Sequence, residues 1–303
     1  MAKKTRRRLR WGRLLFISVV GILLVSGAVW TVMTLLHPAK KDDPQTEIAN
    51  NDSGSQHEDP IETITPPNPF EGLYYYEADR LERYEAYQQK NPDLPVGDVV
   101  WQVNADIDLP LYEDVLTIDP SAVSLLVVNK HQCLPDTYIP ANLVSLANGK
   151  LVTEETKTAF EAMVAAMQED GMTINTNSAY RSYDYQVQLY NRYVSSYGQA
   201  EADTFSARPG HSEHQLGTTL DVYGSNGEYT LFGQTKEYQW VLENGYKFGF
   251  IIRYPEGSEA LTGYKPEPWH LRYVGIEIAT IMHDEGIQIL EEYEVKYVDH
   301  KPQ

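Results

Sequence analysis

Hydrophobic and polar positions follow two spacings along the last two thirds of the chain, one helical and one typical of strands. Residues 154–169 show the helical spacing most clearly, because Phe160, Met163 and Met167 recur on one face. Thr153, just before this segment, is a residue type that commonly caps a helix N-terminus. The pattern therefore predicts an amphipathic helix over residues 154–169.

The other apolar segments are short and alternate irregularly between the two spacings, without an internal repeat. Such an order is typical of an α+β fold in which helices flank a small, mainly antiparallel sheet. Further helices are predicted over residues 78–89, 183–197, 236–243 and 276–284, and strands over residues 99–103, 124–128, 172–176, 219–223, 250–253 and 269–274.

The N-terminal segment has the composition of a membrane anchor. Residues 1–13 carry seven Lys and Arg and no acidic residue, and residues 14–36 contain no charge over 23 positions. At about 1.5 Å per residue, that length spans a bilayer core as a helix. A secretory signal cut after Ala28 is the alternative, but apolar sequence continues beyond that point, which favours an uncleaved transmembrane helix. The basic flank predicts a cytoplasmic N-terminus and an extracytoplasmic remainder.

Residues 37–72 are predicted to be a disordered linker, because they are polar and rich in proline. Residues 73–303 then form the extracytoplasmic domain. Residues 38–303 carry 18 Lys and Arg against 43 Asp and Glu. This acidic balance argues against binding to nucleic acid, whose phosphates require clustered basic side chains. The single cysteine, Cys133, excludes an intrachain disulfide and is predicted to be a small buried residue.

Two short segments contain the candidate chemistry. Seven positions separate His214 from Asp221, and His211 is a second candidate histidine in the first segment. In the second segment, Glu267 lies three positions before His270. Two imidazoles and one carboxylate are a normal ligand set for a catalytic zinc, and a further glutamate can then act as a general base.

Glycine and proline determine how these segments can fold. A turn at Gly217 would bring His214 and Asp221 toward one point. Pro268 disfavours helical backbone at Glu267, so the second segment is predicted to enter a strand as a loop. A helical metalloprotease motif is therefore excluded.

The pattern Ser212-x-His214-x-x-Gly217-x-Thr219-x-Asp221, followed by Glu267-x-x-His270, resembles the signature of VanY-type D-alanyl-D-alanine carboxypeptidases, which are zinc peptidases of the bacterial cell wall. Thr219 stands where the pattern usually has alanine, which removes no ligand. Other segments that match the family in order include Val128-Asn129-Lys130, Ser178-Ala179-Tyr180-Arg181-Ser182, Gly249-Phe250-Ile251-Ile252-Arg253-Tyr254-Pro255 and Thr262-Gly263-Tyr264.

The resemblance implies a D,D-peptidase/Hedgehog-like zinc peptidase fold and a role for each motif residue. The implied zinc ligands are His214, Asp221 and His270, and the implied catalytic base is Glu267. Arg181 would bind the reacting carbonyl. Gln186 and Ser212 would lie near the substrate, and Tyr180, Tyr264 and Trp269 are candidates for the pocket floor.

The implied reaction is the removal of a terminal D-alanine from peptidoglycan stem peptides. An L,D-carboxypeptidase acting on the tetrapeptide stem is the alternative within the class, because no motif here identifies the penultimate stereocentre. A non-catalytic peptidoglycan-binding module is the alternative outside it. That alternative is disfavoured because a binder has no need of Glu267.

Overall fold

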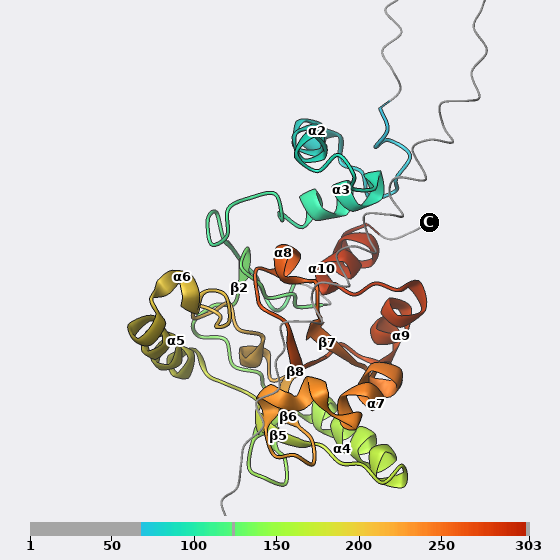
Figure 1. Ribbon diagram of the computed structural model, residues 1–303. Coiled ribbons are helices and arrows are strands. Elements are labelled where there is room, and N and C mark those ends of the chain that lie inside the picture. Colours follow the sequence, from blue (N-terminus) through green and yellow to red (C-terminus); the bar gives the residue numbers. More distant parts are fainter. Residues whose placement is uncertain (1–67, 123–124, 301–303) are drawn as a thin grey trace, which may run out of the picture. The chain divides into compact units, whose positions relative to one another are not determined.

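A four-stranded antiparallel sheet lies at the centre of the computed structural model, which describes residues 68–122 and 125–300 (Figure 1). The strands lie side by side in the order β5 (Asn175–Ser178), β6 (Thr219–Tyr223), β8 (Glu267–Tyr273) and β7 (Phe250–Tyr254). All three neighbouring pairs are antiparallel. The predicted α+β class with a small antiparallel sheet is confirmed.

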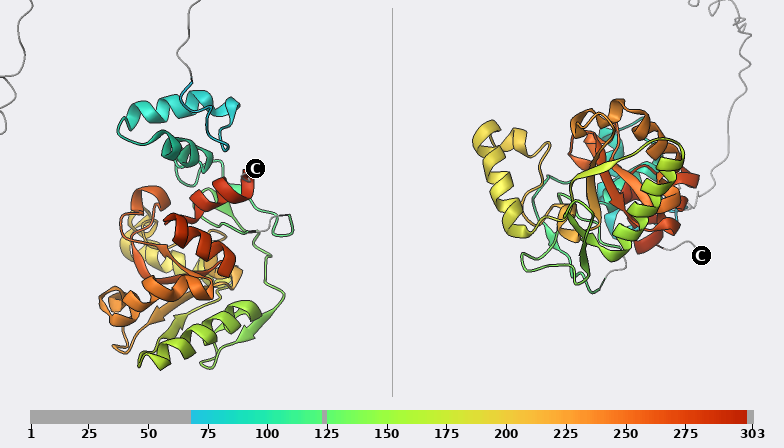
Figure 2. Two further views of the ribbon diagram at one scale, coloured as in Figure 1. Left: turned by 90° about the vertical axis from the view of Figure 1, so that its right-hand side faces the viewer. Right: turned by 90° about the horizontal axis from the view of Figure 1, so that it is seen from below.

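Two helices cover one face of this sheet. Side chains of α4 (Glu154–Glu169) and α7 (Lys236–Asn244) pack in one hydrophobic cluster with alternate residues of the strands. Leu220 and Val222 of β6 and Leu271 of β8 belong to that cluster. In Figures 1 and 2, α5 (Tyr183–Tyr197) and α6 (Gln199–Ala202) lie on the other side of the sheet from α4. The residues between the core positions therefore face away from α4 and α7.

The two longest helices have the predicted bounds because their caps are encoded locally. The side chain of Thr153 accepts a hydrogen bond from the backbone N–H of Thr156 at the start of α4. Ser182 accepts one from Tyr185 at the start of α5, which ends at Gly198 with φ +81°. Such caps satisfy N–H groups that the first helical turn leaves free.

The remaining elements have at most ten residues each, and one of the longest, α9, packs against β7 and η5. They are η2 (Ala78–Arg80), α2 (Leu81–Lys90), α3 (Val96–Asn104), β1 (Leu116–Thr117), β2 (Gln132–Cys133), β3 (Leu143–Ser145), β4 (Leu151–Thr153), η3 (Glu213–Leu216), η4 (Tyr229–Gln234), η5 (Gly245–Phe248), α8 (Glu259–Thr262), α9 (Ile276–Glu285), α10 (Leu290–Tyr293) and η6 (Glu294–Asp299).

The predicted strand over residues 99–103 is wrong, because this segment lies in helix α3. Its β-branched residues favoured a strand, but Val99, Val100 and Val103 are all buried against α2 and the C-terminal segment. Tertiary packing outweighs intrinsic propensity here. The same cluster buries Phe70, so the folded region includes residues that the sequence assigned to the linker.

Other predicted bounds change in smaller ways. Leu125, Val127 and Val128 are buried, but residues 125–128 form no strand. Strand β5 begins at Asn175 instead of residue 172, and β8 begins at Glu267 itself, so Glu267 lies in a strand and not in a loop before one. Cys133 is half-buried in β2, not fully buried as expected.

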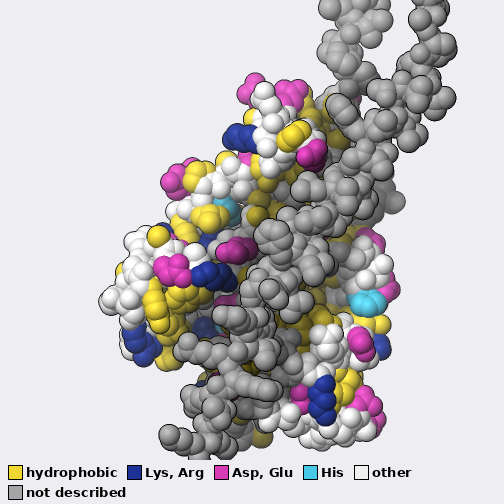
Figure 3. All heavy atoms as spheres, in the orientation of Figure 1, with side chains coloured by type: hydrophobic (Ala, Val, Ile, Leu, Met, Phe, Trp, Pro, Cys, Tyr) yellow, Lys and Arg dark blue, Asp and Glu magenta, His cyan; other side chains and the backbone are white. Residues whose placement is uncertain are grey.

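The predicted membrane helix, residues 14–36, lies outside the described residues. Within residues 68–122 and 125–300, no helix is both long and apolar enough to span a bilayer. On the face drawn in Figure 3, acidic and basic side chains of the described residues are interspersed.

Candidate metal centre

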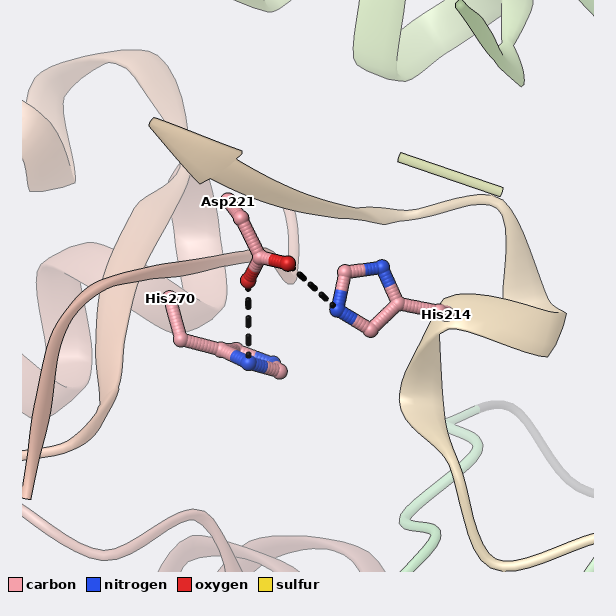
Figure 4. A group of neighbouring side chains, drawn as sticks. All are labelled: His214, Asp221 and His270. Carbon is pink, nitrogen blue, oxygen red and sulfur yellow. Dashed lines mark ion pairs between the residues drawn. The ribbon is translucent and has the colours of Figure 1, made fainter. Parts of the chain in front are cut away.

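Three potential metal ligands converge on the sheet face opposite α4 and α7. Asp221 of β6 and His270 of β8 are direct partners across the two antiparallel strands, so their side chains emerge side by side. His214 reaches them from η3 (Figure 4). One donor atom from each of the three residues lies within 4.8 Å of the other two, and all three residues are buried.

A tight turn at Gly217 places His214 beside the strand that follows it. Gly217 ends η3 with φ +71°, a backbone conformation that residues with a side chain rarely adopt. A Cβ atom there would also lie 2.9 Å from Cδ2 of Leu143. The turn that the sequence predicted at Gly217 is therefore present, and both conformation and space require glycine.

The two histidines present different ring nitrogens to Asp221. Nδ1 of His214 lies 2.7 Å from the carbonyl of Ala179, to which it donates, and this leaves Nε2 free at 3.4 Å from Oδ2 of Asp221. In His270, Nδ1 faces the site at 3.6 Å from Oδ1 of Asp221, and Nε2 lies 3.7 Å from Oε2 of Glu213. Two neutral nitrogens and one carboxylate fit zinc.

The charges around the site affect the two histidines in opposite directions. Burial and the nearby Arg181 lower the pKa of His214 to about 4. Burial alone would also lower the pKa of His270, but the carboxylates of Glu213, Glu267 and Asp221 raise it to about 9. The site is thus rich in negative charge on the His270 side, as a cation site should be.

Glu267 lies beside the three ligands without belonging to their group. Its Oε2 is 3.1 Å from Nδ1 of His270, and its side chain lines the cleft described below. Burial raises the pKa of this carboxyl above its ordinary value, partly opposed by His270. A carboxylate with a raised pKa next to a metal site is suited to accept a proton near neutral pH.

Arg181 follows β5 and reaches the same site. Its Nη2 donates to Oδ2 of Asp221 at 2.6 Å, and its Nε donates to Oγ of Ser178 at 3.0 Å. Among the described residues that line the cleft it is the one Lys or Arg. Arg181 therefore supplies fixed positive charge on the Asp221 side of the site.

The ligands lie at the bottom of a cleft of about 270 Å³. We call the face that bears His214, Asp221, Glu267 and His270 the metal side. The substrate side is built from Leu189 and Tyr193 of α5 and from residues of two loops, namely Phe205, Ser206, Ala207 and Tyr264.

The other residues predicted near the substrate take different positions. Ser212, Tyr264 and Trp269 line the cleft, but Tyr180 does not. Gln186 lies behind the wall, where its Nε2 donates to the carbonyl of Ala207 at 2.8 Å. Its position supports the wall instead of a direct contact with substrate.

His211, the second candidate histidine, belongs elsewhere. Its Nδ1 lies 2.7 Å from the carbonyl of Asn129, and its ring packs edge-on against Tyr112. It is absent from the group of potential metal ligands found among the described residues.

Lys130, to which the sequence analysis assigned no role, holds the substrate side together. Its side chain is 2% exposed, and Nζ donates to the carbonyls of Asp203 at 2.6 Å and Gly263 at 2.7 Å. It also lies 4.2 Å from the ring centre of Tyr264. Burial lowers the pKa of this ammonium to about 8. Lys130 thus connects the two loops that form the wall.

Glu213 is a second residue whose role the sequence did not reveal. This glutamate precedes His214 and is fully buried between Arg253 of β7 and Arg272 of β8, at 2.8 and 2.9 Å. The available signal in the sequence was one arginine in each of two predicted strands, since buried arginines need acidic partners.

Known proteins resemble this chain in sequence and fold. A family model described as D-alanyl-D-alanine carboxypeptidase, VanY, matches residues 149–276, which include every metal-side residue and Arg181. The Bacillus subtilis (strain 168) protein YodJ, named as a carboxypeptidase without a stated substrate, is 36% identical over 61% of this chain and 72% of its own length.

Solved structures of carboxypeptidases also resemble this chain. The LD-carboxypeptidase LdcB is 34% identical, with a TM-score of 0.53 over 59% of this chain and 97% of that one. VanYB in complex with D-alanine-D-alanine is 35% identical, with a TM-score of 0.52 over 57% of this chain and 98% of that one. A VanY variant in complex with Zn(II) is 36% identical, with a TM-score of 0.51 over 56% of this chain and 98% of that one.

Fold, site and relatives together define a carboxypeptidase of the zinc-peptidase class. The chain belongs to the VanY family of D-alanyl-D-alanine carboxypeptidases.

Proposed function

We propose that this protein is a zinc-dependent carboxypeptidase that removes the terminal D-alanine from peptidoglycan stem peptides. The observation that carries the proposal is the convergence of three potential metal ligands, the carboxylate of Glu267 and the guanidinium of Arg181 in a single cleft. Similarity to a Zn(II)-bound VanY and to VanYB with bound D-alanine-D-alanine supports both the metal and the substrate class.

The described residues fit zinc through Nε2 of His214, a carboxylate oxygen of Asp221 and Nδ1 of His270. Three protein ligands of this kind leave a coordination position open, as catalytic zinc sites require. Zinc bound there would polarise the scissile carbonyl and make a water molecule acidic enough to ionise near neutral pH.

The protein's own residues account for proton transfer and charge stabilisation. Glu267, whose pKa is raised by burial, accepts the proton of the attacking water and then donates it to the departing amine of D-alanine. Arg181 stabilises the negative charge that develops on the carbonyl oxygen, because it is held in the cleft before substrate arrives.

The stem peptide that is cut distinguishes the two carboxypeptidase candidates. The full-length protein in detergent, loaded with zinc, should be incubated with muropeptides that carry a pentapeptide or a tetrapeptide stem. Mass spectrometry should show the loss of one alanine from the pentapeptide, and a chelator should abolish it. Cleavage of the tetrapeptide alone would establish the L,D-specific alternative, which similarity to LdcB favours. Binding of stems without cleavage would establish the non-catalytic module.

We also propose that residues 14–36 anchor the enzyme in the cell membrane, with the catalytic domain on the outside. The support is the uncharged length of this segment and the basic residues on its N-terminal side alone. Protease added to intact cells should release the domain and leave the N-terminal fragment with the membrane. An active protein in the medium that begins just after Ala28 would show instead that the segment is a cleaved signal.

A further inference from the structure

Two buried polar atoms face each other just behind the metal ligands. Oε1 of Glu213 is paired with Arg253 and Arg272, whereas Oε2 lies 3.7 Å from Nε2 of His270. Among the described side chains, neither Oε2 nor Nε2 has a hydrogen-bond partner. Unpaired buried polar atoms are rare because each costs free energy, so their facing positions call for an explanation.

We propose that Glu213 is a positioning residue that sets the tautomer of His270. In a neutral imidazole whose Nε2–H donates to Oε2, the lone pair lies on Nδ1, which faces Asp221 and lies 3.1 Å from Oε2 of Glu267. A hydrogen bond between these two atoms would satisfy both of them, and it requires the separation to shorten from 3.7 Å to about 3 Å. This inference rests on the proposed zinc site.

A chain of buried ion pairs holds the Glu213 carboxylate in place. Arg253 donates to Glu213 through Nε at 2.8 Å and to both carboxylate oxygens of Glu291 at 2.6 and 3.0 Å. Glu291, in α10, also accepts from Nδ2 of Asn129 at 3.1 Å. The orientation of His270 is therefore fixed by residues from β7, α10 and the Asn129 loop, through Glu213.

The other potential histidine ligand, His214, is oriented by a different kind of hydrogen-bond acceptor. Nδ1 of His214 donates to the main-chain carbonyl of Ala179, which is fixed by the fold and carries no formal charge. His270 has a carboxylate in the equivalent place. A carboxylate behind a metal-bound histidine orients the ring and makes it a stronger electron donor to the metal. The two rings should thus be opposite tautomers.

The first test compares Glu213→Gln with Glu291→Gln in the full-length protein. Both substitutions remove one negative charge from the same buried chain, but only Glu213 faces His270. Zinc affinity should be measured by competition with a chromophoric chelator, and the folded fraction by circular dichroism. Glu213→Gln should weaken zinc binding about 10- to 100-fold, whereas Glu291→Gln should change it less than about threefold.

The second test needs no variant and therefore does not depend on the folding of Glu213→Gln. Nitrogen NMR of the zinc-loaded wild-type protein, labelled in histidine, should show His270 protonated at Nε2 and His214 protonated at Nδ1. Protonation of His270 at Nδ1, or equal zinc affinity in folded Glu213→Gln and wild type, would overturn the inference. A wild-type protein that binds no zinc would instead overturn the proposed function on which it rests.

Discussion

The metal side and the substrate side of the cleft are fixed by different physical means. On the metal side, Asp221 and His270 project from paired strands, and charged side chains buried behind them hold them in place. On the substrate side, one ammonium, Lys130, connects two loops through their main-chain carbonyls. Strands fix reacting groups to within fractions of an ångström, whereas loops can change shape without disturbing the sheet. Chemistry and recognition can therefore be altered separately in this molecule.

The substitution with the largest expected effect is Glu267→Gln on the metal side. It keeps the volume of the side chain but removes the group that accepts a proton. The turnover number should fall at least about 100-fold, while zinc content and fold stay unchanged. Stopped assays with the pentapeptide stem and elemental analysis would measure both quantities. Glu259→Gln, an exposed change in α8, serves as the control. Near wild-type turnover would mean that Glu267 is not the base.

A smaller effect of a different kind is expected from Lys130→Met on the substrate side. The change leaves the carbonyls of Asp203 and Gly263 without their buried donor, so the loops that carry Phe205 and Tyr264 should loosen. KM should rise about tenfold, a loss of roughly 1.4 kcal/mol of binding, while zinc affinity is unchanged.

Lys265→Met is the matched control for Lys130→Met. Lys265 is an exposed lysine near the same wall, paired with Glu201 at 2.7 Å. Its replacement should leave KM unchanged. Loss of zinc from Lys130→Met would contradict the independence of the two sides.

The smallest effect concerns Glu294 in η6, a carboxyl near Glu291, and appears only as a pH dependence. Burial, together with the charges of Asp299 and Glu291, raises the pKa of Glu294 to about 8, against a hydrogen bond from Gln132. A raised folded-state pKa means that the folded protein binds the proton more tightly than the unfolded chain does. This contribution to stability is complete below about pH 4.5 and is lost as the pH rises through 8.

Glu294→Gln should therefore flatten the decline in melting temperature between about pH 4.5 and 8. Glu277→Gln, an exposed change in α9, should leave the decline as in wild type. Thermal unfolding followed by circular dichroism at several pH values would measure it. If the melting temperature of Glu294→Gln depended on pH as in wild type, the Glu294 carboxyl of the wild-type protein would be ionised at neutral pH in the folded state.

The sequence predicted which three side chains converge, His214, Asp221 and His270, because their positions are encoded over short distances. The caps of α4 and α5, the turn at Gly217 and the extended residue before Pro268 all follow from neighbouring residues. Residues 99–103 were mistaken for a strand because their burial against Phe70 and the C-terminal segment comes from distant parts of the chain.

Residues that act through other residues could not be predicted from the sequence, for a similar reason. The motifs assign no role to Glu213 or Lys130. Their partners lie 40 or more positions away: Arg253 for Glu213, and Asp203 and Gly263 for Lys130. A charged residue that looks exposed in sequence can be buried once its partner is in place. Such pairs become visible only when the fold is known.

The direct pairing of Asp221 with His270 makes the metal site a check on correct folding. Side chains alternate between the two faces of a sheet, so a shift of β6 by one residue would turn Asp221 toward the core of α4 and α7 and expose Leu220 instead. A misregistered chain would have no third ligand. Any ion that requires all three ligands would bind the native register alone and stabilise it by mass action. Metal supply during folding would then influence how much of this protein matures, as well as how fast it works.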